Sequence, residues 1–387
     1  MTSVTGDWLT RDATQRVMAM LEEAGFLAYA VGGCVRNALL GEPVADVDIS
    51  TDARPETVIA LAEAARLKAV PTGIDHGTIT VVCDGQGYEI TTFRADIETD
   101  GRRAVVRFAT DVAEDALRRD FTMNALYADR RGTLIDPLGG LPDLLARRFR
   151  FIEDPDTRIR EDYLRILRFF RFSAWYADPA QGMDLDALAA IAANLDGLGQ
   201  LSAERVGAET LKLLSAPDPL FAVSVMHQTG VLAHILPGAV VTALGPLIVH
   251  ETALGLPADP LRRMAVMGFF DGGALRLSKA QQRHLALYQS LIGASDTLSD
   301  IAYRHGAETA RDLAALRAAS FETVPDPDAL ARIDHAAQAR FPVAGRDLMP
   351  DIQGPDLGQT LRDLEAQWIA SDFTLDRNSL LARVKKA

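Results

Sequence analysis

Residues 31–37 read Val-Gly-Gly-Cys-Val-Arg-Asn, and ten residues after Arg36 the chain continues with Asp46-Val47-Asp48. The glycine pair stands between a short apolar run, residues 26–31, and a predicted helix at 35–40 that Gly41 stops. Glycines between a strand and a helix let backbone amides approach a triphosphate closely, and Arg36 could contact the same phosphates. A simple tight turn explains the two glycines equally well. The combination of the pair with the two aspartates is more specific than either alone.

The two aspartates stand two residues apart in a predicted strand, 44–51, whose alternation places Asp46, Asp48 and Ser50 on one face. Carboxylates that project the same way can share divalent cations, and Mg²⁺ suits carboxylate and phosphate oxygens. Glu89, flanked by apolar and β-branched residues in another predicted strand, is the candidate third carboxylate of a two-metal site. In such sites one metal activates the attacking hydroxyl and the other neutralises the leaving pyrophosphate. Alternating acids on an exposed edge strand are the competing interpretation.

The first third of the chain mixes strand and helix signals, and the rest indicates helices. Residues 78–83 and 88–93 are β-rich runs on either side of Asp84-Gly85-Gln86-Gly87, which predicts a hairpin. Residues 94–110 are polar and lack periodicity, which indicates a mobile loop, although an inert surface loop fits as well. Beyond Asp156 helical spacing recurs between Pro- or Gly-marked breaks. The expected fold class is therefore α+β, with an all-helical C-terminal half whose first predicted helices are 160–176, 185–194 and 203–214.

Composition restricts the function classes. With 387 residues, the chain is long enough for two or three compact domains. Its net charge of −13 argues against a nucleic-acid binder held by overall positive charge, so any RNA contact must be local. Arginine clusters could supply local positive surface, and pairing with neighbouring acids is the alternative. Without a signal-peptide pattern, a membrane-spanning run or more than two cysteines, the sequence predicts a cytoplasmic protein with no membrane contact.

Several motifs agree in order with those of a known family. The chain resembles the bacterial class of CCA-adding tRNA nucleotidyltransferases, a family that also includes bacterial poly(A) polymerases. The resemblance covers residues 29–171 well and 202–214 more loosely. One departure is Asn37, where the family usually has Asp, so any ion pair made by that Asp is lost. The motifs are Val31–Asn37 with Asp46–Asp48, Arg118–Leu126, Asp136–Gly140 with Asp143-Leu144, and Glu161–Arg168.

The resemblance implies a polymerase-β-like nucleotidyltransferase head at residues 1–146. A helical neck that selects the nucleotide would follow at 147–215, and a helical body and tail that bind tRNA at 216–387. Asp46 and Asp48 would hold catalytic Mg²⁺, with Glu89 as the third catalytic carboxylate. The predicted nucleotide-binding residues are Gly32, Gly33, Arg36, Arg119, Asp120, Asp162, Arg165, Arg168 and Arg171.

The predicted helix at 160–176 bears most on substrate choice. Asp162, Arg165 and Arg168 recur every three residues, which would set them along one side of the helix, and Arg171 continues this stripe. In the resembling enzymes the Asp and the first Arg read the Watson–Crick edge of the incoming base. A carboxylate accepts from the exocyclic amino group of cytosine or adenine, and a guanidinium donates to ring nitrogens or carbonyls. An i, i+3 ion pair between Asp162 and Arg165, worth ~0.2–0.5 kcal/mol, is the alternative.

The resemblance predicts template-independent addition of C, C and A to the 3′ end of tRNA. CTP and ATP would be the substrates, and no protein partner is predicted. In the resembling enzymes a flexible loop equivalent to 94–110 is needed for the switch to adding A; here Gly101 would act as a hinge and Arg102-Arg103 as phosphate-seeking side chains. A poly(A) polymerase or A-adding enzyme of the same family is the close alternative. From another class, a non-catalytic RNA-binding protein on this scaffold would be expected to have lost one of the three carboxylates.

Overall fold

The computed structural model describes residues 2–100, 103–324, 326, 328–349 and 351–384. The chain forms two compact units. Unit 1 consists of Met1–Leu213 and Phe221–Ile235, and unit 2 of Leu214–Leu220 and Leu236–Ala387. The predicted division into head, neck, and body with tail remains a prediction. Unit 1 takes in the predicted head and nearly all of the predicted neck.

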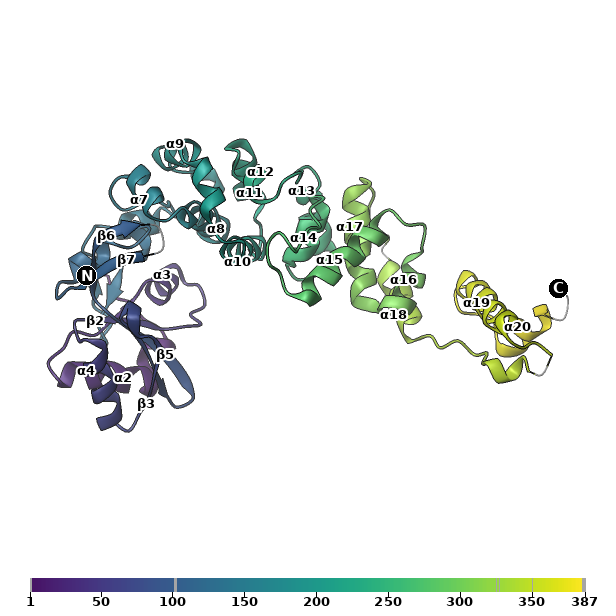
Figure 1. Ribbon diagram of the computed structural model, residues 1–387, viewed down its shortest axis with the longest axis horizontal. Coiled ribbons are helices and arrows are strands. Elements are labelled where there is room, and N and C mark those ends of the chain that lie inside the picture. Colours follow the sequence, from purple (N-terminus) through teal and green to yellow (C-terminus); the bar gives the residue numbers. More distant parts are fainter. Residues whose placement is uncertain (1, 101–102, 325, 327, 350, 385–387) are drawn as a thin grey trace. The chain divides into compact units, whose positions relative to one another are not determined.

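A seven-stranded sheet forms the centre of the first part of unit 1, with strand order β3-β4-β5-β2-β1-β8-β9 (Figure 1). β2 and β5 run parallel, and the other neighbouring pairs in this order are antiparallel. The β4–β5 turn has positive φ at both Asp84 (52°) and Gly85 (81°), which matches the primed turns that suit the twist of a hairpin. The strands are β1 Tyr29–Val31, β2 Asp48–Thr51, β3 Lys68–Gly73, β4 Thr78–Cys83, β5 Gln86–Thr92, β8 Tyr127–Ala128 and β9 Leu134–Ile135.

Helices cover one face of this sheet. α2 (Asp12–Glu23) and α4 (Pro55–Ala64) pack against β4 and β5 and against each other. β4 alternates between buried and partly buried residues, so its buried side chains meet these helices. α3 (Gly33–Leu40) packs against β1 and ends at Gly41, whose φ of 74° gives a left-handed C-terminal cap. The short helices of this part are α1 Asp7–Thr10, α5 Val112–Leu117 and α6 Leu141–Leu145.

The segment predicted as a loop, 94–110, is a second sheet. β6 (Arg94–Asp100) and β7 (Arg103–Phe108) pair antiparallel, with an irregular register between Asp96 and Glu98. The loop prediction was wrong because charged residues hide the alternation, whereas backbone pairing between two neighbouring strands needs no apolar face. Gly101 and Arg102, the predicted hinge and one of the phosphate-seeking residues, lie outside the described residues.

Helices follow in the rest of unit 1, and no described residue beyond Asp156 belongs to a strand, which confirms the α+β class. The predicted helix at 160–176 is two helices that meet at Asp162 and Tyr163. α7 starts with the favoured pair of an Asp N-cap, Asp154, and Pro155 at the first helical position. The helices are α7 Pro155–Glu161, α8 Leu164–Tyr176, α9 Leu185–Ala193, α10 Ala203–Leu214, α11 Leu220–Gln228 and α12 Val231–Ile235.

An aromatic cluster joins α8 to the sheet-bearing part of unit 1. The ring centroid of Phe121 lies 4.9 Å from that of Phe151, 6.1 Å from Phe169 and 5.7 Å from Phe172. Phe121, Phe151 and Phe169 are fully buried. Aromatic side chains contribute large buried areas, so this cluster makes α8 part of the same core as the loop that carries Arg119 and Asp120.

Unit 2 is helical in its described residues, and no described helix of the chain is long and apolar enough to cross a membrane. Helices α13 to α18 share one core, and a smaller cluster around Trp368, Leu364 and Leu380 includes α19 and α20. The helices are α13 Leu244–Ala253, α14 Pro260–Val266, α15 Lys279–Ile292, α16 Leu298–His305, α17 Ala307–Ser320, α18 Ala329–Gln338, α19 Pro355–Ala370 and α20 Arg377–Val384.

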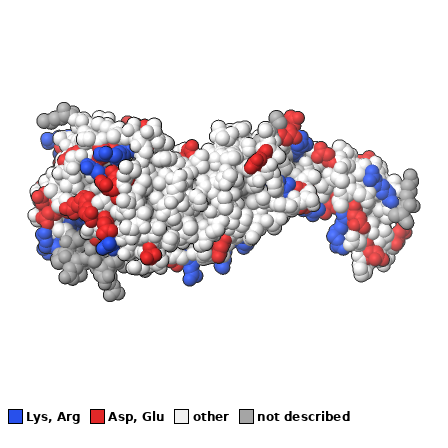
Figure 2. All heavy atoms as spheres, turned by 90° about the horizontal axis from the view of Figure 1, so that it is seen from above, with Lys and Arg blue, Asp and Glu red and all other residues white. Residues whose placement is uncertain are grey.

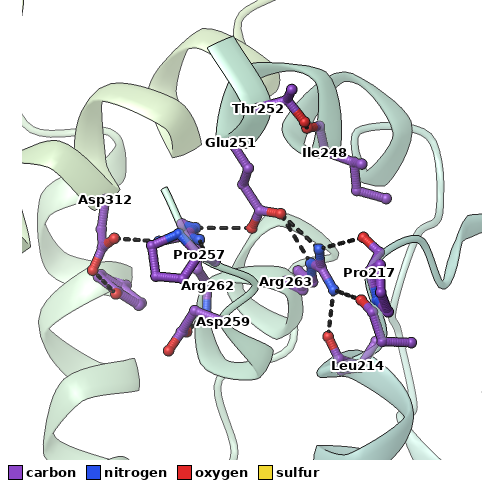
Figure 3. A network of polar contacts seen from close by, with 12 residues as sticks. Leu214, Pro217, Ile248, Glu251, Thr252, Pro257, Asp259, Arg262, Arg263 and Asp312 are labelled. Carbon is purple, nitrogen blue, oxygen red and sulfur yellow. Dashed lines mark hydrogen bonds and ion pairs between the residues drawn. The ribbon is translucent and has the colours of Figure 1, made fainter. Parts of the chain in front are cut away.

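A buried polar network holds the first segment of unit 2 (Figure 3). Glu251 of α13 accepts from Arg262 at 2.9 Å and from Arg263 at 2.8 Å, and Arg262 also pairs with Asp312 of α17. Arg263 is 1 % exposed and donates to the carbonyls of Leu214 (2.6 Å), Ala216 and Pro217 (3.1 Å). This one guanidinium therefore fixes the connection 214–217 to α13 and α14.

Replacing Arg263 by Met should destabilise the protein by about 3–5 kcal/mol. The change removes one of the two arginines that pair with buried Glu251, and it leaves three backbone carbonyls without this donor. The midpoint of urea unfolding, followed by circular dichroism, measures the effect. The matched control is Arg311→Met, since the Arg311–Asp334 pair is partly exposed, at 38 % and 47 %, and should contribute under about 1 kcal/mol. Equal effects of the two substitutions would contradict the importance of the buried network.

Candidate active site

The glycine pair follows β1 and leads into α3, as predicted, but α3 begins at Gly33, two residues before the predicted start at Val35. Gly32 is the N-cap with φ 70°, a conformation that glycine adopts without steric cost, and Gly33 is the first helical residue. A Cβ added to Gly32 would lie 3.5 Å from Nη1 of Arg119. The turn therefore brings the amide end of α3 beside a guanidinium, and both groups suit an anion.

Arg36 is buried, at 5 % exposure, and joins α3 to α8. Its Nη1 donates to Oδ1 of Asn124 (2.7 Å), its Nη2 to the hydroxyl of Tyr176 (3.0 Å), and its Nε and Nη2 to Oδ1 of Asn37 (3.2 and 2.9 Å). Burial lowers the pKa of Arg36. Asn37 thus keeps the hydrogen bond, without the ion pair that an Asp would make. The predicted contact of Arg36 with a triphosphate remains a prediction.

The carboxylates lie on β2 and β5. Asp48 is paired with Glu89 in the parallel register, and both residues are exposed to solvent. Asp46 was predicted to share the strand, but β2 begins only at Asp48. The short partner β1 pairs with Ser50 and Ile49 alone, so the residues before Asp48 have no partner from β1. Asp46 consequently lies in the preceding connection, exposed to solvent.

The pKa of Asp48 is raised to about 6. The protein around the carboxyl removes part of its hydration, Glu89 and Asp46 add repulsion, and Arg119 partly offsets these effects. A divalent cation would relieve this repulsion, so the oxygen donors fit Mg²⁺ chemistry. Within the described residues, however, no three His, Cys, Asp or Glu side chains are gathered in an arrangement that could hold a metal ion. The metal role of Asp46 and Asp48 and the catalytic role of Glu89 therefore stay predictions.

Arg119 lies next to these carboxylates. Its Nη2 donates to Oγ of Ser50 (3.2 Å), two residues along β2 from Asp48, and to Asp115 (3.0 Å), while its Nε donates to the hydroxyl of Tyr127 (2.9 Å). Burial lowers the pKa of Arg119, but Tyr127 and Asp115 outweigh it and raise the pKa above the ordinary value. Arg119 is thus a fixed cation beside Asp48.

Asp120 makes the buried connection to α8. Its Oδ2 accepts from Nε and Nη2 of Arg168 at 2.7 and 2.6 Å, and its Oδ1 accepts from Asn124 (3.0 Å) and from the backbone N–H of Phe121 (2.9 Å). Burial alone would raise the pKa of Asp120, yet these donors lower it below its usual value. The charged form of Asp120 is therefore favoured by its donors, and both of its carboxylate oxygens have a partner.

Three arginines surround one aromatic ring of α8. The guanidinium carbons of Arg36, Arg168 and Arg171 lie 5.0, 5.2 and 4.0 Å from the ring centroid of Phe172. Arg171 pairs with Glu209 of α10 at 2.6 Å. The structure thus brings together Arg36, Asp120, Arg168 and Arg171 of the predicted site.

The predicted stripe from Asp162 to Arg171 is wrong at its first member. Asp162 has φ −156° and ψ 103°, so it lies between α7 and α8 and not on a helix. Its Oδ1 accepts from the N–H of Leu164 (3.1 Å), which favours this break, and its Oδ2 accepts from Arg205 of α10 (2.6 Å). Arg165 pairs with Glu161, so the alternative Asp162–Arg165 ion pair is not formed either.

Tyr163, next to Asp162, packs on the backbone of Gly197. A Cβ added to Gly197 would lie 2.0–2.4 Å from atoms of the Tyr163 ring. Real Cβ contacts are never this short, so the residue must be glycine for Tyr163 to remain in place. Gly197 thereby supports the backbone of the extended residue Asp162.

Sequence reasoning missed Arg205 and Asn124. Arg205 holds Asp162 from 43 residues away, a separation that carries no spacing signal. Asn124 binds both Arg36 and Asp120, and its place inside the motif Arg118–Leu126 was the one available hint. Tyr176 was likewise missed, because a tyrosine at the end of an amphipathic helix looks like ordinary core.

The arginine clusters are largely paired with acids. Arg148 and Arg150 both reach Asp143 at 2.9 Å, and Arg119 reaches Asp115. On the face shown in Figure 2, acidic and basic side chains lie close together, and no continuous basic stripe crosses the coloured residues. Local pairing, the alternative interpretation of these clusters, therefore describes many of them.

Replacing Gly197 by Ala should lower the free energy of unfolding by about 1–3 kcal/mol, because Tyr163 must move to admit the methyl group. Gly199→Ala is the matched control in the same turn, since a Cβ there would meet nothing within 4 Å. Thermal unfolding of both variants measures the difference. Tyr163→Ala should remove the clash. If the destabilisation of the double variant Gly197→Ala with Tyr163→Ala equals the sum of the destabilisations of the two single variants, this explanation is contradicted.

Replacing Asp48 by Asn should raise the midpoint of thermal unfolding by about 1–3 °C at pH 7 in a chelating buffer. The pKa of Asp48 in the folded protein, about 6, exceeds the ordinary value of 3.8. Protonation of Asp48 therefore stabilises the folded state, fully below pH ~4, and this stabilisation is lost as the pH rises through 6. Asn imitates the protonated form. The gain should therefore disappear as the pH falls toward 4, and a wild-type protein more stable than the variant at pH 7 would disprove the repulsion.

Comparisons with known proteins identify the family of the chain. The family described as Poly A polymerase head domain matches residues 28–150, and the one described as Probable RNA and SrmB- binding site of polymerase A matches residues 182–241. The CCA tRNA nucleotidyltransferase 1, mitochondrial, of Mus musculus is 31 % identical over 372 residues, which cover 92 % of this chain and 86 % of the mouse protein.

Bacterial relatives match a shorter region more closely. The CCA-adding enzyme of Geobacillus thermodenitrificans is 41 % identical over 224 residues, and the match spans 57 % of this chain and about half, 54 %, of that enzyme. The solved structure of the Bacillus stearothermophilus CCA-adding enzyme in complex with CTP is similar with a TM-score of 0.73 and 28 % identity, covering 97 % of this chain and 98 % of that one. The chain therefore belongs to the family of CCA-adding tRNA nucleotidyltransferases and poly(A) polymerases, as its motifs predict.

Proposed function

We propose that this protein adds C, C and A to the 3′ end of tRNA, from CTP and ATP, without a nucleic-acid template. The observation that carries the proposal is the Asp120–Arg168 ion pair, because it ties the loop beside Asp48 to the helix that follows Asp162. Under this proposal the phosphate-binding region and the base-reading segment would belong to one site. Relatives named as CCA-adding enzymes support the same activity.

The chemistry divides among the residues of the site. Asp46 and Asp48 would hold Mg²⁺, with Glu89 as the third carboxylate; the bound metal would activate the attacking hydroxyl and neutralise the leaving pyrophosphate. Arg119 and the amide end of α3 at Gly32-Gly33 would bind and orient the triphosphate. The amide end of α3 and Arg119 already lie close together, so binding of the triphosphate would need little reorganisation of these two groups.

Base selection would use Asp162 and Arg165. Asp162 accepts from the amino group of cytosine or adenine and would repel the keto oxygens of uracil or guanine. Its extended backbone places the carboxylate outside the helix, and the carboxylate oxygens accept from the N–H of Leu164 and from Arg205. Leaving one such buried contact unpaired costs ~1–3 kcal/mol, which gives roughly 10- to 100-fold discrimination.

Two further points belong to the proposal. The β6–β7 sheet lies in the segment equivalent to the loop that resembling enzymes need for adding A, which favours full CCA addition or A addition over an enzyme that adds only the two C residues. The Glu161-Asp162 pair favours the CCA branch over poly(A) polymerase. We also propose a cytoplasmic location, although the mouse relative is named as mitochondrial.

Replacing both Asp46 and Asp48 by Ala should lower nucleotide incorporation roughly 100-fold or more, because the metal-binding oxygens are lost, and should leave tRNA binding largely intact. The assay supplies CTP and ATP, separately and together, to tRNA transcripts that lack CCA, end in CC or carry CCA. Product length separates the alternatives. Three added nucleotides support the proposal, and open-ended A tails indicate a poly(A) polymerase. Extension of the CC-ended transcript alone indicates an A-adding enzyme.

The matched control is the double variant Glu56→Ala and Glu63→Ala, which removes two exposed carboxylates from α4 of the same unit. It should keep wild-type incorporation. Unchanged incorporation by the Asp46 and Asp48 variant would exclude the metal-site hypothesis, and absence of incorporation by wild-type protein that binds tRNA would favour the non-catalytic alternative.

A further inference from the structure

Arg158 of α7 has no role in the chemistry proposed for this site. It is 4 % exposed, so its charge is almost entirely removed from water. A buried guanidinium is costly unless its donors are matched by acceptors, and the identity of these acceptors shows what it holds together.

Two of the acceptors of Arg158 come from different parts of the site. Its Nη1 donates to Oε2 of Glu161 at 2.5 Å, one turn along the same helix. Its Nη2 donates to the backbone carbonyl of Arg119 at 2.6 Å. The guanidinium therefore bridges the main chain of the triphosphate-binding residue and the acid next to Asp162.

Arg165 completes the arrangement. Its Nη1 donates to the same Oε2 of Glu161 and, at 2.6 Å, to the backbone carbonyl of Arg158, and its Nη2 reaches the carbonyl of Arg118 at 3.4 Å. The consecutive carbonyls of Arg118 and Arg119 thus each accept from a guanidinium of the segment 158–165. A single oxygen of Glu161 accepts from both guanidinium groups, so this carboxylate is shared between Arg158 and Arg165.

We propose that Arg158 is a positioning residue for nucleotide selection: it holds Glu161 and the Arg119 main chain at a fixed separation, so that Arg165 meets the base while the triphosphate lies beside Asp48. This inference rests on the proposed function. Arg165 must exchange some of its present bonds to donate to a base, because Nη1 is engaged twice. Arg158 keeps Glu161 bonded during that exchange, so the acid stays in place instead of following Arg165.

The geometry requires an arginine. Lys keeps the charge but presents one ammonium, which lacks the rigid fork that reaches a carboxylate and a carbonyl at once. Gln loses the charge and leaves Glu161 to Arg165 alone, which would hold Arg165 away from the base. The two substitutions therefore separate the charge of Arg158 from its bridging shape.

The test compares wild type, Arg158→Lys and Arg158→Gln in single-turnover incorporation of CTP and of UTP into tRNA lacking CCA. We expect the preference for CTP over UTP, as the ratio of kcat/KM values, to fall about tenfold in Arg158→Gln, with a raised KM for CTP, and less in Arg158→Lys. Arg160→Gln is the matched control from the same helix, since Arg160 is exposed and pairs with Asp156. Its preference should equal that of wild type.

Thermal unfolding is measured on the same samples. Equal loss of CTP and UTP incorporation, with an unchanged preference in both Arg158 variants, would overturn the proposal and leave Arg158 a structural residue. If Arg158→Gln does not fold, the folded Arg158→Lys variant decides by the same ratio. A wild-type protein that incorporates neither nucleotide contradicts the proposed function, and this outcome is distinct from any result of the variants.

Discussion

The buried ion pair between Asp120 and Arg168 is the interaction on which the site depends. Asp120 has lost nearly all contact with water and receives three hydrogen bonds in exchange, one of them from Nε of Arg168, whose Nη2 adds an ion-pair contact. A buried charge whose partner is removed is strongly destabilising. The pair therefore tolerates little relative movement between the loop after α5 and helix α8. Asn124 extends the same constraint to Arg36 and through it to α3 and Tyr176.

Local features of the fold followed from the sequence. The β4–β5 hairpin, the start of α3 at the glycine pair and the helical second half were predicted by turn chemistry and periodicity, because these depend on neighbouring residues. The β6–β7 sheet was missed, since strand pairing in a polar segment leaves no alternation of hydrophobicity. The break at Asp162 was missed for a related reason. A carboxylate that bonds a backbone N–H two residues on interrupts a helix without changing its apolar pattern.

The sequence predicted residues of the candidate site only where a motif includes them or where an acid stands in an unusual place. Asp48, Arg119 and Asp120 are candidates because the motifs include them, and Glu89 is a candidate because an acid is unusual within a β-rich run. Contacts between distant segments could not be predicted from the sequence. Examples are the contact of Arg205 with Asp162 and that of Arg158 with the carbonyl of Arg119. These depend on how helices pack, which no spacing along the chain records.

The course of the chain between the units has a consequence for modularity. The backbone leaves unit 1 at Leu214, returns at Phe221 and leaves again at Leu236, so neither unit is one uninterrupted stretch of sequence. A catalytic fragment ended at Ile235 would carry the segment 214–220 without Arg263, whose guanidinium satisfies its carbonyls. Recombination at a single crossover point would break this arrangement, so exchange of the helical second unit between relatives requires that Arg263 and its acceptors be inherited together.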